Sequence, residues 1–390
     1  MKKVKFLHCA DIHLDAPFTS IGTQGNKSSI RREDLKKTFQ RIVDVARYED
    51  VDLFLIAGDL YEHEYVRKST ISFINDRFSE IPDVRVFIVP GNHDPYVANS
   101  CYKNCKWSPN VHIFTENRTY AVLEDLGVCI YGGVFSGFHE ARTLVSGIKK
   151  IDGHLINILL VHGTVGLDFG RGAYNPMSVA DLDSLEMDYV ALGHFHNTIE
   201  GMGKKGTIYN PGSPEPLGFD ETGQHGAFVG TIIKSEGTAH IADLRFISLN
   251  SRFYENVEVD VGGCNGDSEV IDRICGALPE GDLTKGLFGV TLKGCIEPGY
   301  KINPSQIQQY FENRVFFMKI KDETYAGYDF DELIKEPGLR GTFVRKALSL
   351  IDRAEDENRR RLLMKALYYG LEALDRGTIE IAESRLNRGG

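Results

Sequence analysis

The chain has 390 residues, 42% of them hydrophobic, which suits one large α/β domain with a smaller one beside it. Asp and Glu outnumber Lys and Arg by 55 to 45, and this balance argues against a protein that binds nucleic acid through positive charge alone. A phosphodiester substrate stays open, because bound divalent cations would bring positive charge of their own.

Cysteine usage and the N-terminus indicate the compartment. The seven cysteines are scattered, and they form neither a disulfide framework nor a complete zinc motif. The apolar stretch near the N-terminus is interrupted at His8 and Asp11, too early for a signal peptide, and no apolar run approaches membrane-spanning length. We therefore expect reduced thiols, a cytoplasmic protein and no membrane partner.

Over the first 250 residues, short runs rich in Val, Ile, Leu and Phe alternate with helix-period segments, which predicts a layered α/β sandwich. Helices are predicted over 31–48 and 64–80. Strands from about residue 206 leave no room for helices between them and should be antiparallel. The predicted strands are 3–9, 52–57, 84–89, 128–134, 155–161, 188–192, 206–209, 226–233 and 239–248.

The pattern changes near residue 250. We predict a main domain over 1–250, a small α+β domain over 251–335 and a helical segment over 336–390. Two helices are expected in that last segment, at 341–354 and 356–376. Their apolar stripes would suit docking to a partner, and packing against the chain's own domain explains them equally well.

Polar side chains of metal-ligand type follow five of the predicted strands. The carboxyl ends of strands in an open α/β sheet border the functional crevice, so residues far apart in sequence should converge there. Residues i and i+2 of an extended segment point the same way, which lets one strand end offer two ligands. The residues are Asp11 and His13, Asp59, Asn92 with His93 and Asp94, His162, and His194 with His196.

A single His at a strand end is usually a hydrogen-bonded structural residue, but five strand ends with matched residue types favour a metal site. Two carboxylates, several imidazoles and an amide are too many ligands for one ion and suit two, with one carboxylate bridging. Mixed nitrogen and oxygen ligands fit Mn²⁺, Fe or Zn²⁺ better than Mg²⁺ or Ca²⁺. Two such ions, about 3.5–4 Å apart, are typical of phosphoester hydrolysis.

The blocks D-x-H, G-D, G-N-H-D, H-G and G-H-x-H occur in that order, and the chain resembles the calcineurin-like metallophosphoesterases. The segments "FLHCADIHLDAPF", "LFLIAGDLYE", "GNHDPY", "LGHFH" and "YNPGSPEPLGFDE" are similar to the SbcD-type DNA repair exonucleases, particularly their YhaO-like branch. The resemblance is close over about residues 3–250 and looser beyond. It implies a four-layer α/β/β/α sandwich with a small α+β capping domain and C-terminal helices.

The resemblance also implies the cofactor, substrate and partners. It points to two divalent ions per chain, with Mn²⁺ preferred, and to cleavage of DNA phosphodiesters. Proteins of this kind commonly act beside a coiled-coil SMC-like ATPase, and a homodimer is expected from the same likeness. In those proteins a capping domain shapes the DNA groove, and helices after it bind the ATPase.

Residue roles follow from the same motifs. The first metal would be held by Asp11, His13 and His196, the second by Asn92, His162 and His194, with Asp59 bridging both. By the same likeness His93 would contact the scissile phosphate and help to stabilise or protonate the departing 3′ oxygen, with Asp94 orienting its ring. A loop His fixed by Asp94 with no catalytic part is the alternative for His93.

One position departs from the pattern. The nuclease group often has a second His shortly after the bridging Asp, as in G-D-L-F-H, whereas this chain has Glu62 there and a His only at position 63. His63 is one candidate for substrate contact, although a surface His is an equal alternative. Ser213 and His225, in a turn-rich segment, are the other candidates, and turn chemistry alone explains most of that segment.

Three functions are consistent with these residues. The first is a Mn²⁺-dependent DNA phosphodiesterase in DNA repair, a 3′→5′ exonuclease with some single-strand endonuclease activity. The second is a phosphoesterase acting on small molecules, which needs no DNA groove and which the acidic charge mildly favours. The third is a scaffold without catalysis that binds DNA or an ATPase, and the intact ligand set argues against it.

Overall fold

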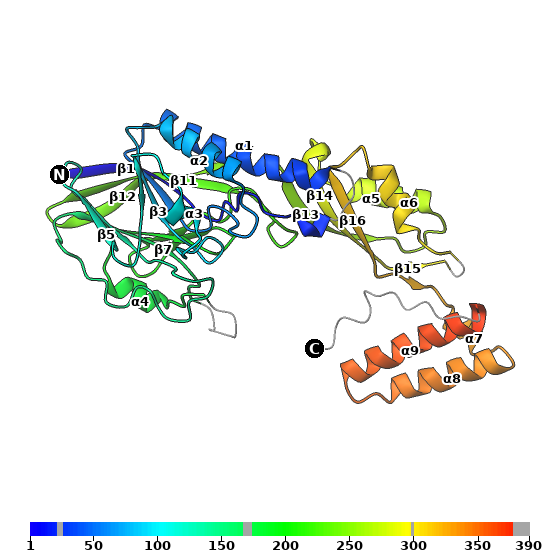
Figure 1. Cartoon of the computed structure of the whole chain (residues 1–390). Helices are drawn as coiled ribbons and strands as arrows, with labels where there is room; N and C mark the ends of the chain where they lie inside the picture. The colour runs from blue at the N-terminus through cyan, green and yellow to red at the C-terminus, as the bar shows by residue number, and fades with distance from the viewer. Residues whose placement is uncertain (22–25, 167–173, 298–299, 377–390) are drawn as a thin grey trace. The chain divides into compact units, whose positions relative to one another are not determined.

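The computed structural model describes residues 1–21, 26–166, 174–297 and 300–376, and the chain divides into two compact units, Met1–Tyr254 and Glu255–Gly390 (Figure 1). The separation of 251–335 from 336–390 as distinct domains stays a prediction. Within the described part of the chain, no helix is both long and apolar enough to cross a membrane.

The first unit contains a six-stranded sheet in the order β12-β11-β1-β2-β3-β4. Strands β1 to β4 are parallel, and β11 is antiparallel to both β1 and β12. The strands are β1 (Lys2–Cys9), β2 (Leu53–Ala57), β3 (Arg85–Val89), β4 (Val111–Ile113), β11 (Gly226–Ser235) and β12 (Thr238–Ser248).

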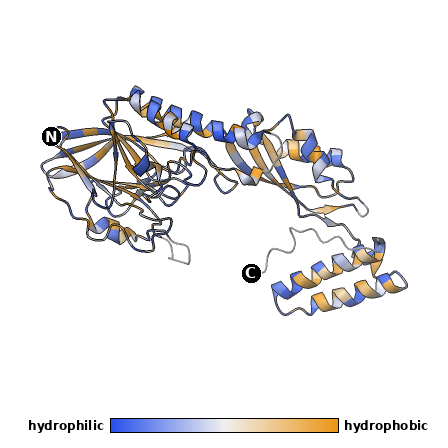
Figure 2. Cartoon of the chain, in the orientation of Figure 1, coloured by the Kyte–Doolittle hydropathy of each residue, from blue (hydrophilic) through white to orange (hydrophobic). Residues whose placement is uncertain are grey.

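Two helices cover the outer face of this sheet, α1 (Lys27–Tyr48) and α2 (Lys68–Ser79). The ring of Phe78 on α2 meets Phe39 of α1 and Phe54 of β2, with centroids 5.6 and 6.1 Å apart. Figure 2 shows largely hydrophilic residues along the visible side of α1 and largely hydrophobic strands behind it, as expected for an amphipathic helix on a sheet.

A second six-stranded sheet has the order β5-β6-β7-β8-β10-β9. Strands β6, β7, β8 and β10 are parallel to one another, and the edge strands β5 and β9 are antiparallel to β6 and β10. The strands are β5 (Tyr120–Leu123), β6 (Val128–Gly132), β7 (Ile156–His162), β8 (Tyr189–Gly193), β9 (Ile199–Met202) and β10 (Ile208–Asn210).

The two sheets pack face to face through one apolar core. Leu55 of β2 and Ile158 of β7 belong to this inner core, whereas Leu159 faces the opposite side and packs with Leu182 of α4 (Val179–Ser184). The period-2 alternation of these strands therefore gives each sheet two buried faces. The order helices, sheet, sheet, helix confirms the predicted four-layer α/β/β/α sandwich.

The predicted antiparallel course after residue 206 is correct for β11 and β12 but wrong for β10. The short strand β9 reverses the chain after β8, so β10 returns parallel to β8. The helix predicted over 64–80 begins only at Lys68, after a turn in which Val66 donates to the Glu62 carbonyl. The unit also contains two short helical turns, Thr19–Ile21 and α3 (Cys101–Asn104).

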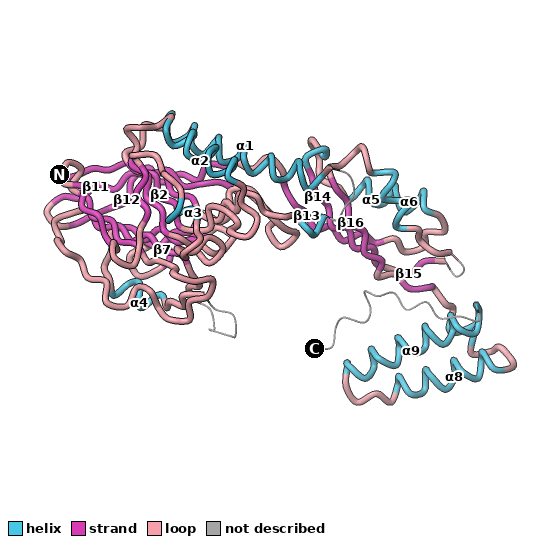
Figure 3. Tube along the Cα trace, in the orientation of Figure 1, coloured by secondary structure: helices cyan, strands magenta, loops and turns pink. Residues whose placement is uncertain are grey.

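The second unit combines a small sheet with helices (Figure 3). Its three-stranded sheet has the order β13-β14-β16, and β15 pairs with β17. Helices α8 and α9 pack through Val344, Ile351, Leu367 and Leu371. The elements are β13 (Phe253–Asp260), α5 (Asp267–Ala277), a 3-10 turn (Leu283–Lys285), β14 (Gly286–Lys293), β15 (Cys295–Ile296), α6 (Pro304–Phe311), β16 (Phe317–Asp322), β17 (Tyr325–Ala326), α7 (Phe330–Leu333), α8 (Leu339–Asp352) and α9 (Glu357–Arg376).

A buried ion pair attaches α1 to the loop that follows β10. The Arg31 side chain, fully buried, donates to Glu215 at 2.5 Å and to Asp34 at 3.2 Å. The other carboxylate oxygen of Glu215 accepts from the Thr38 hydroxyl at 2.7 Å and the Ser251 amide at 2.6 Å. Both terminal nitrogens of Arg31 and both oxygens of Glu215 have partners, and removal of one partner is expected to be costly.

We expect Arg31→Met to destabilise the first unit by about 3–5 kcal/mol, because it leaves the Glu215 charge buried without its cation. Arg47→Ala is the matched control, since Arg47 lies on the same helix, its side chain is 60% exposed, and its ion pair with Asp44 is on the surface. Urea unfolding curves of both variants measure the difference. Equal stability of Arg31→Met and wild type would contradict this account.

Candidate metal centre

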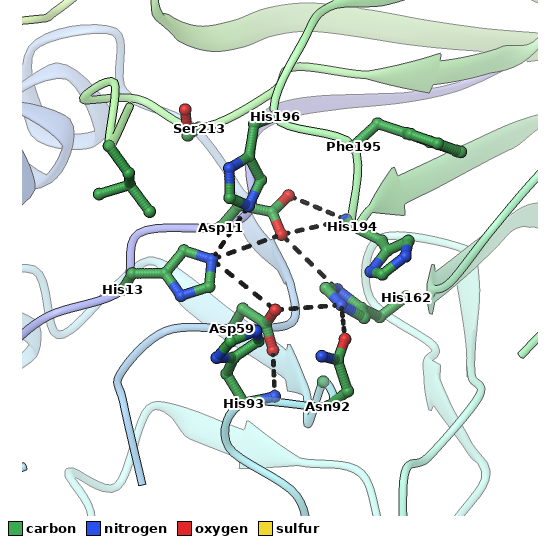
Figure 4. A network of polar contacts seen from close by, with 12 residues as sticks. Asp11, His13, Asp59, Asn92, His93, His162, His194, Phe195, His196 and Ser213 are labelled. Atoms are coloured by element: carbon green, nitrogen blue, oxygen red, sulfur yellow. Dashed lines mark hydrogen bonds and ion pairs between the residues drawn. The ribbon is translucent and has the colours of Figure 1, made fainter. Parts of the chain in front are cut away.

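The residues that follow the five strands converge at one edge of the two sheets (Figure 4). Asp11 and His13 come after β1, Asp59 after β2 and Asn92 after β3, all in the first sheet. The second sheet contributes His162 at the end of β7, and His194 and His196 after β8. The parallel strands at the centre of each sheet all end at this edge, so the two sheets deliver ligand-type side chains from opposite sides.

The backbone at these strand ends is unusual. Asp11, His13, Asp59 and His194 all have positive φ, at 51°, 49°, 53° and 104°. Residues with a Cβ rarely adopt such values, and each costs of the order of 1–3 kcal/mol. Gly91 allows a close approach, because a Cβ there would overlap the carboxylate of Asp59. The local strain turns the polar side chains of these strand ends toward one point.

Two carboxylates lie at the centre, and both are almost completely buried. Asp11 accepts the amide N–H of His194 at 2.9 and 3.1 Å. Asp59 accepts the amide N–H of His93 at 2.8 Å and lies 3.2 Å from Nε2 of His162. Burial raises the pKa of Asp11. Burial acts in the same direction on Asp59, but the neighbouring imidazole of His162 outweighs it and lowers the pKa of that carboxyl.

Three imidazoles present their Nε2 atoms to these carboxylates. The Nε2 atoms of His13 and His196 are 3.2 Å apart, and Nε2 of His162 is 2.9 Å from the Asn92 side-chain oxygen. The opposite nitrogens have their own acceptors. Nδ1 of His13 contacts Glu62 at 2.8 Å, Nδ1 of His196 contacts Glu221 at 2.7 Å, and Nδ1 of His162 contacts the carbonyl of residue 57 at 2.9 Å.

The hydrogen bonds at the Nδ1 atoms indicate whether these residues suit a metal ion. Acceptors at all three Nδ1 atoms fix the proton there, which leaves the Nε2 lone pairs of His13, His162 and His196 facing inward. Converging lone pairs beside two buried carboxylates are mutually repulsive unless a cation lies between them. Neutral imidazole, carboxylate and amide oxygen form a donor set suited to a divalent transition metal. The arrangement fits such an ion.

The pKa values of these imidazoles reflect the carboxylates beside them. Burial acts to lower the pKa of His162 and of His196, but the carboxylates beside them outweigh it and raise both values to about 9. Burial lowers the pKa of His194 to about 3, and its ring packs against His162 with centroids 5.1 Å apart.

The ligand atoms form groups with spacing suited to a metal. Asp11, His13 and His196 form one group, and Asp11, Asp59 and His162 form another, with all atoms of a group within 4.8 Å of one another. The first contains the three residues expected at the first ion. The second contains the expected bridging Asp59 and one expected ligand of the second ion. His194 belongs to neither group, and its assignment as a ligand stays a prediction.

His93 lies at the outer side of the centre, and its side chain is 45% exposed. The prediction that Asp94 orients its ring does not agree with the contacts. Asp94 is fully buried and accepts from the amides of Asp59, Leu60 and Gly91 at 2.6–3.1 Å. The Asp94 carboxylate therefore turns inward and connects the loop after β2 to the loop after β3. Burial raises the pKa of Asp94 to about 6.

Glu62 is the group that holds the His93 ring. Its two oxygens accept from Nδ1 of His13 at 2.8 Å and from Nδ1 of His93 at 3.0 Å. The hydrogen bond to Glu62 raises the pKa of His93 to about 9. Burial acts to raise the pKa of Glu62, but its bonds to the two imidazoles lower it to about 2. One carboxylate therefore connects an expected metal ligand to the expected catalytic group.

The three residues expected to contact substrate have different surroundings. Ser213 and His225 are almost fully buried, and Ser213 donates to Glu221 at 2.7 Å and lies 3.1 Å from the His225 ring. Ser213 supports Glu221, and His225 contacts Ser213 in turn. Direct contact of either residue with substrate stays a prediction. The amide of His63 donates to the carbonyl of His93 at 3.0 Å, and its ring packs edge-on against Phe138.

The roles of Glu62 and Glu221 were not predicted. Glu62 stands out in the sequence only as a departure from a family motif, and Glu221 lies in a loop 25 residues after the His that it contacts. Glu62 lies in the loop after β2 and Glu221 in the loop after β10, and periodicity gives no signal for loop residues. The one available signal is that a metal-ligating His usually donates its second ring N–H to a carboxylate or carbonyl.

The family model described as calcineurin-like phosphoesterase matches residues 4–198, which is half of the chain. The chain therefore belongs to the calcineurin-like phosphoesterase family. Every strand end that contributes to the centre lies within this range. Members of this family use divalent metal ions, in agreement with the Asp and His groups of the centre.

Three curated relatives are similar over the first part of the chain. The uncharacterized metallophosphoesterase YhaO of Bacillus subtilis is 28% identical over 235 residues, 57% of this chain and 56% of the relative. The DNA double-strand break repair protein Mre11 of Methanopyrus kandleri is 24% identical, covering 57% and 52%. A subunit of the nuclease SbcCD of Staphylococcus epidermidis is 24% identical, covering 50% and 57%.

These matches span only about half the length of each curated relative. A solved structure, TT1561 of Thermus thermophilus, covers 61% of this chain and 98% of its own at 12% identity. Its TM-score of 0.36 is too low to bear on the fold. The relatives nevertheless agree with the resemblance to YhaO-like and SbcD-type proteins.

Loss of the carboxylate behind His196 should weaken metal binding. We expect Glu221→Ala to lower the affinity for a divalent metal by about 10- to 100-fold, because the His196 ring loses the acceptor that fixes its orientation. Glu221→Gln keeps an acceptor oxygen and should recover most of the affinity. Isothermal titration with Mn²⁺ measures the change, and Glu200→Ala, an exposed position on β9, is the control. Unchanged affinity in Glu221→Ala would contradict the role.

Proposed function

We propose that this chain is a metal-dependent phosphodiesterase that cleaves DNA, with Mn²⁺ as its preferred ion. The observation that carries the proposal is the placement of His93 at the edge of the centre. Its ring is partly exposed, and its Nδ1 is held by Glu62. A group that is fixed on one nitrogen and free on the other suits proton transfer to a substrate that approaches from solvent.

The proposed ligands are those expected from the motifs. Asp11, His13 and His196 would hold one ion, and Asn92, His162 and His194 the other, with Asp59 between them. When bound, the two ions supply a water of lowered pKa and positive charge beside the phosphate. The carboxyl groups and imidazoles fit this task because their lone pairs already converge on one buried point.

The chain's own residues complete the reaction as follows. His93 Nδ1 donates to Glu62, so Nε2 is the nitrogen that gives a proton to the leaving 3′ oxygen as the bond from phosphorus to that oxygen breaks. A water oxygen forms the new bond to phosphorus, and the proton lost by that water restores His93. Glu62 keeps the His93 ring in register with His13, and hence with the ions.

Two of the relatives support DNA as the substrate, since one is named as a DNA double-strand break repair protein and one as part of a nuclease. We therefore propose that the chain acts in DNA repair, as a 3′→5′ exonuclease with some single-strand endonuclease activity. A cytoplasmic location belongs to the same proposal. The alternative function is a small-molecule phosphoesterase, which would use the same centre.

A coiled-coil ATPase partner and a homodimer are further parts of the proposal. The second unit supports an apolar partner surface, because Leu339, Leu350 and Leu362 on α8 and α9 are 55–73% exposed. Exposed leucines on paired helices suit docking of another helix. Size-exclusion chromatography with light scattering tests the homodimer directly.

The substrate class is tested with Mn²⁺, labelled single- and double-stranded DNA, and bis-p-nitrophenyl phosphate. Wild type should degrade DNA and His93→Ala should not. Cleavage of the small ester alone would favour the small-molecule phosphoesterase. Cleavage of neither substrate would support the scaffold, provided that the protein retains its metal.

Asn92 and His93 are neighbours in the chain, but we expect them to have different roles. We expect His93→Ala to keep two metal ions per chain and to lose about 10²–10⁴-fold in rate, because only the proton donor is removed. Asn92→Ala should lower metal occupancy, because it removes an expected oxygen ligand. Metal analysis after gel filtration, together with DNA cleavage rates, separates the two effects. A metal lost from His93→Ala would contradict the assignment of roles.

A further inference from the structure

The loop after β6 places an exposed aromatic ring beside the metal centre. Phe138 is 49% exposed, whereas Phe135, three residues earlier, is fully buried. The Phe135 ring packs edge-on against the ring of His162, with centroids 5.7 Å apart and an interplanar angle of 82°. The loop therefore begins in contact with an expected metal ligand and then carries a phenyl ring to the surface.

The loop is held at both ends by groups that belong to the surroundings of the centre. The carbonyl of Phe135 accepts the amide N–H of Tyr96 at 2.8 Å, from the segment that follows His93. The carbonyl of Glu140 accepts the amide N–H of Asn175 at 2.6 Å, and the Asn175 side chain donates to the His162 carbonyl at 2.7 Å. These bonds fix the position of Phe138 relative to His162.

On its other side, Phe138 is connected to the expected proton donor through His63. Its ring meets the ring of His63 edge-on, with centroids 5.3 Å apart and an interplanar angle of 71°. The amide of His63 in turn donates to the carbonyl of His93 at 3.0 Å. One residue therefore separates Phe138 from His93.

We propose that Phe138 is a stacking subsite for a nucleobase, specifically the base of the nucleotide that carries the leaving 3′ oxygen. This rests on the proposed DNA phosphodiesterase function. An anchored, exposed aromatic ring binds any base by its face, which requires no cluster of positive charge. That property suits a chain with an excess of acidic residues. A base in a duplex is already stacked and paired, so the subsite takes an unpaired nucleotide.

The test compares two 5′-labelled single-stranded oligonucleotides, one unmodified and one with an abasic sugar at the nucleotide that carries the leaving oxygen of a chosen bond. Cleavage at that bond is measured for wild type, Phe138→Ala and Phe138→Trp, with Mn²⁺. Tyr48→Ala is the control, because Tyr48 is 89% exposed and lies five residues before β2, at the end of that strand opposite Asp59.

Wild type and the Tyr48→Ala control should cleave the unmodified bond about tenfold more efficiently than the abasic one, in kcat/KM. Phe138→Ala should lose this preference through a higher KM for the unmodified strand, while its rate on the abasic strand stays that of wild type. Phe138→Trp should keep the preference. A preference that persists in Phe138→Ala, or is absent from wild type, would overturn the subsite.

The two proposals fail in distinguishable ways. A wild-type chain that hydrolyses bis-p-nitrophenyl phosphate but leaves both oligonucleotides intact would overturn the DNA phosphodiesterase function and the subsite with it. Cleavage of both oligonucleotides at equal rates would overturn the stacking subsite alone. A lower rate of Phe138→Ala on both strands would assign the ring a structural role and would also overturn the subsite.

Discussion

The structure of the first unit depends on the burial of two neighbouring carboxylates, Asp11 and Asp59, between two sheets. Buried like charges are unfavourable unless hydrogen bonds and opposite charge surround them. The amides of His93 and His194 supply hydrogen bonds, and Nε2 of His162 lies 3.2 Å from the Asp59 carboxylate. The strained backbone at these positions has a purpose in this setting, because positive φ turns each carboxylate toward the shared point.

Compensation for these charges extends well beyond the groups that touch them. Glu221 fixes the His196 ring, and Ser213 donates to Glu221 from behind. The loop that carries Ser213 and Glu221 also contains Glu215, which is fastened to Arg31 of α1 by a fully buried ion pair. A helix on the outer face of the first sheet is therefore connected, through one loop, to the orientation of an expected metal ligand. These contacts therefore both stabilise the unit and help to orient an expected metal ligand.

Sequence patterns predicted the parts that depend on periodicity. Apolar alternation located the central strands, and ligand-type residues after them indicated where Asp11, Asp59 and His162 would meet. The patterns did not predict which side chains in different loops form hydrogen bonds with one another. Asp94 is adjacent to His93 in the chain, yet its carboxylate turns inward to backbone amides, and Glu62 holds the ring instead. Ser213 and His225 were candidates for substrate contact in a turn-rich segment, but their burial is a tertiary property that turn chemistry does not reveal.

The Glu at position 62 changes how the outer side of the centre works. A carboxylate facing a phosphate would repel it. Both oxygens of Glu62 are engaged by imidazoles, and its side chain is only 14% exposed, so its charge is directed at His13 and His93. Glu62 therefore orients the ring of the proposed proton donor. Under the proposed function, contact with the nucleotide would come from neighbouring side chains that carry no negative charge. The rings of His63 and Phe138 have that property, and the His63 amide bonds to the His93 carbonyl.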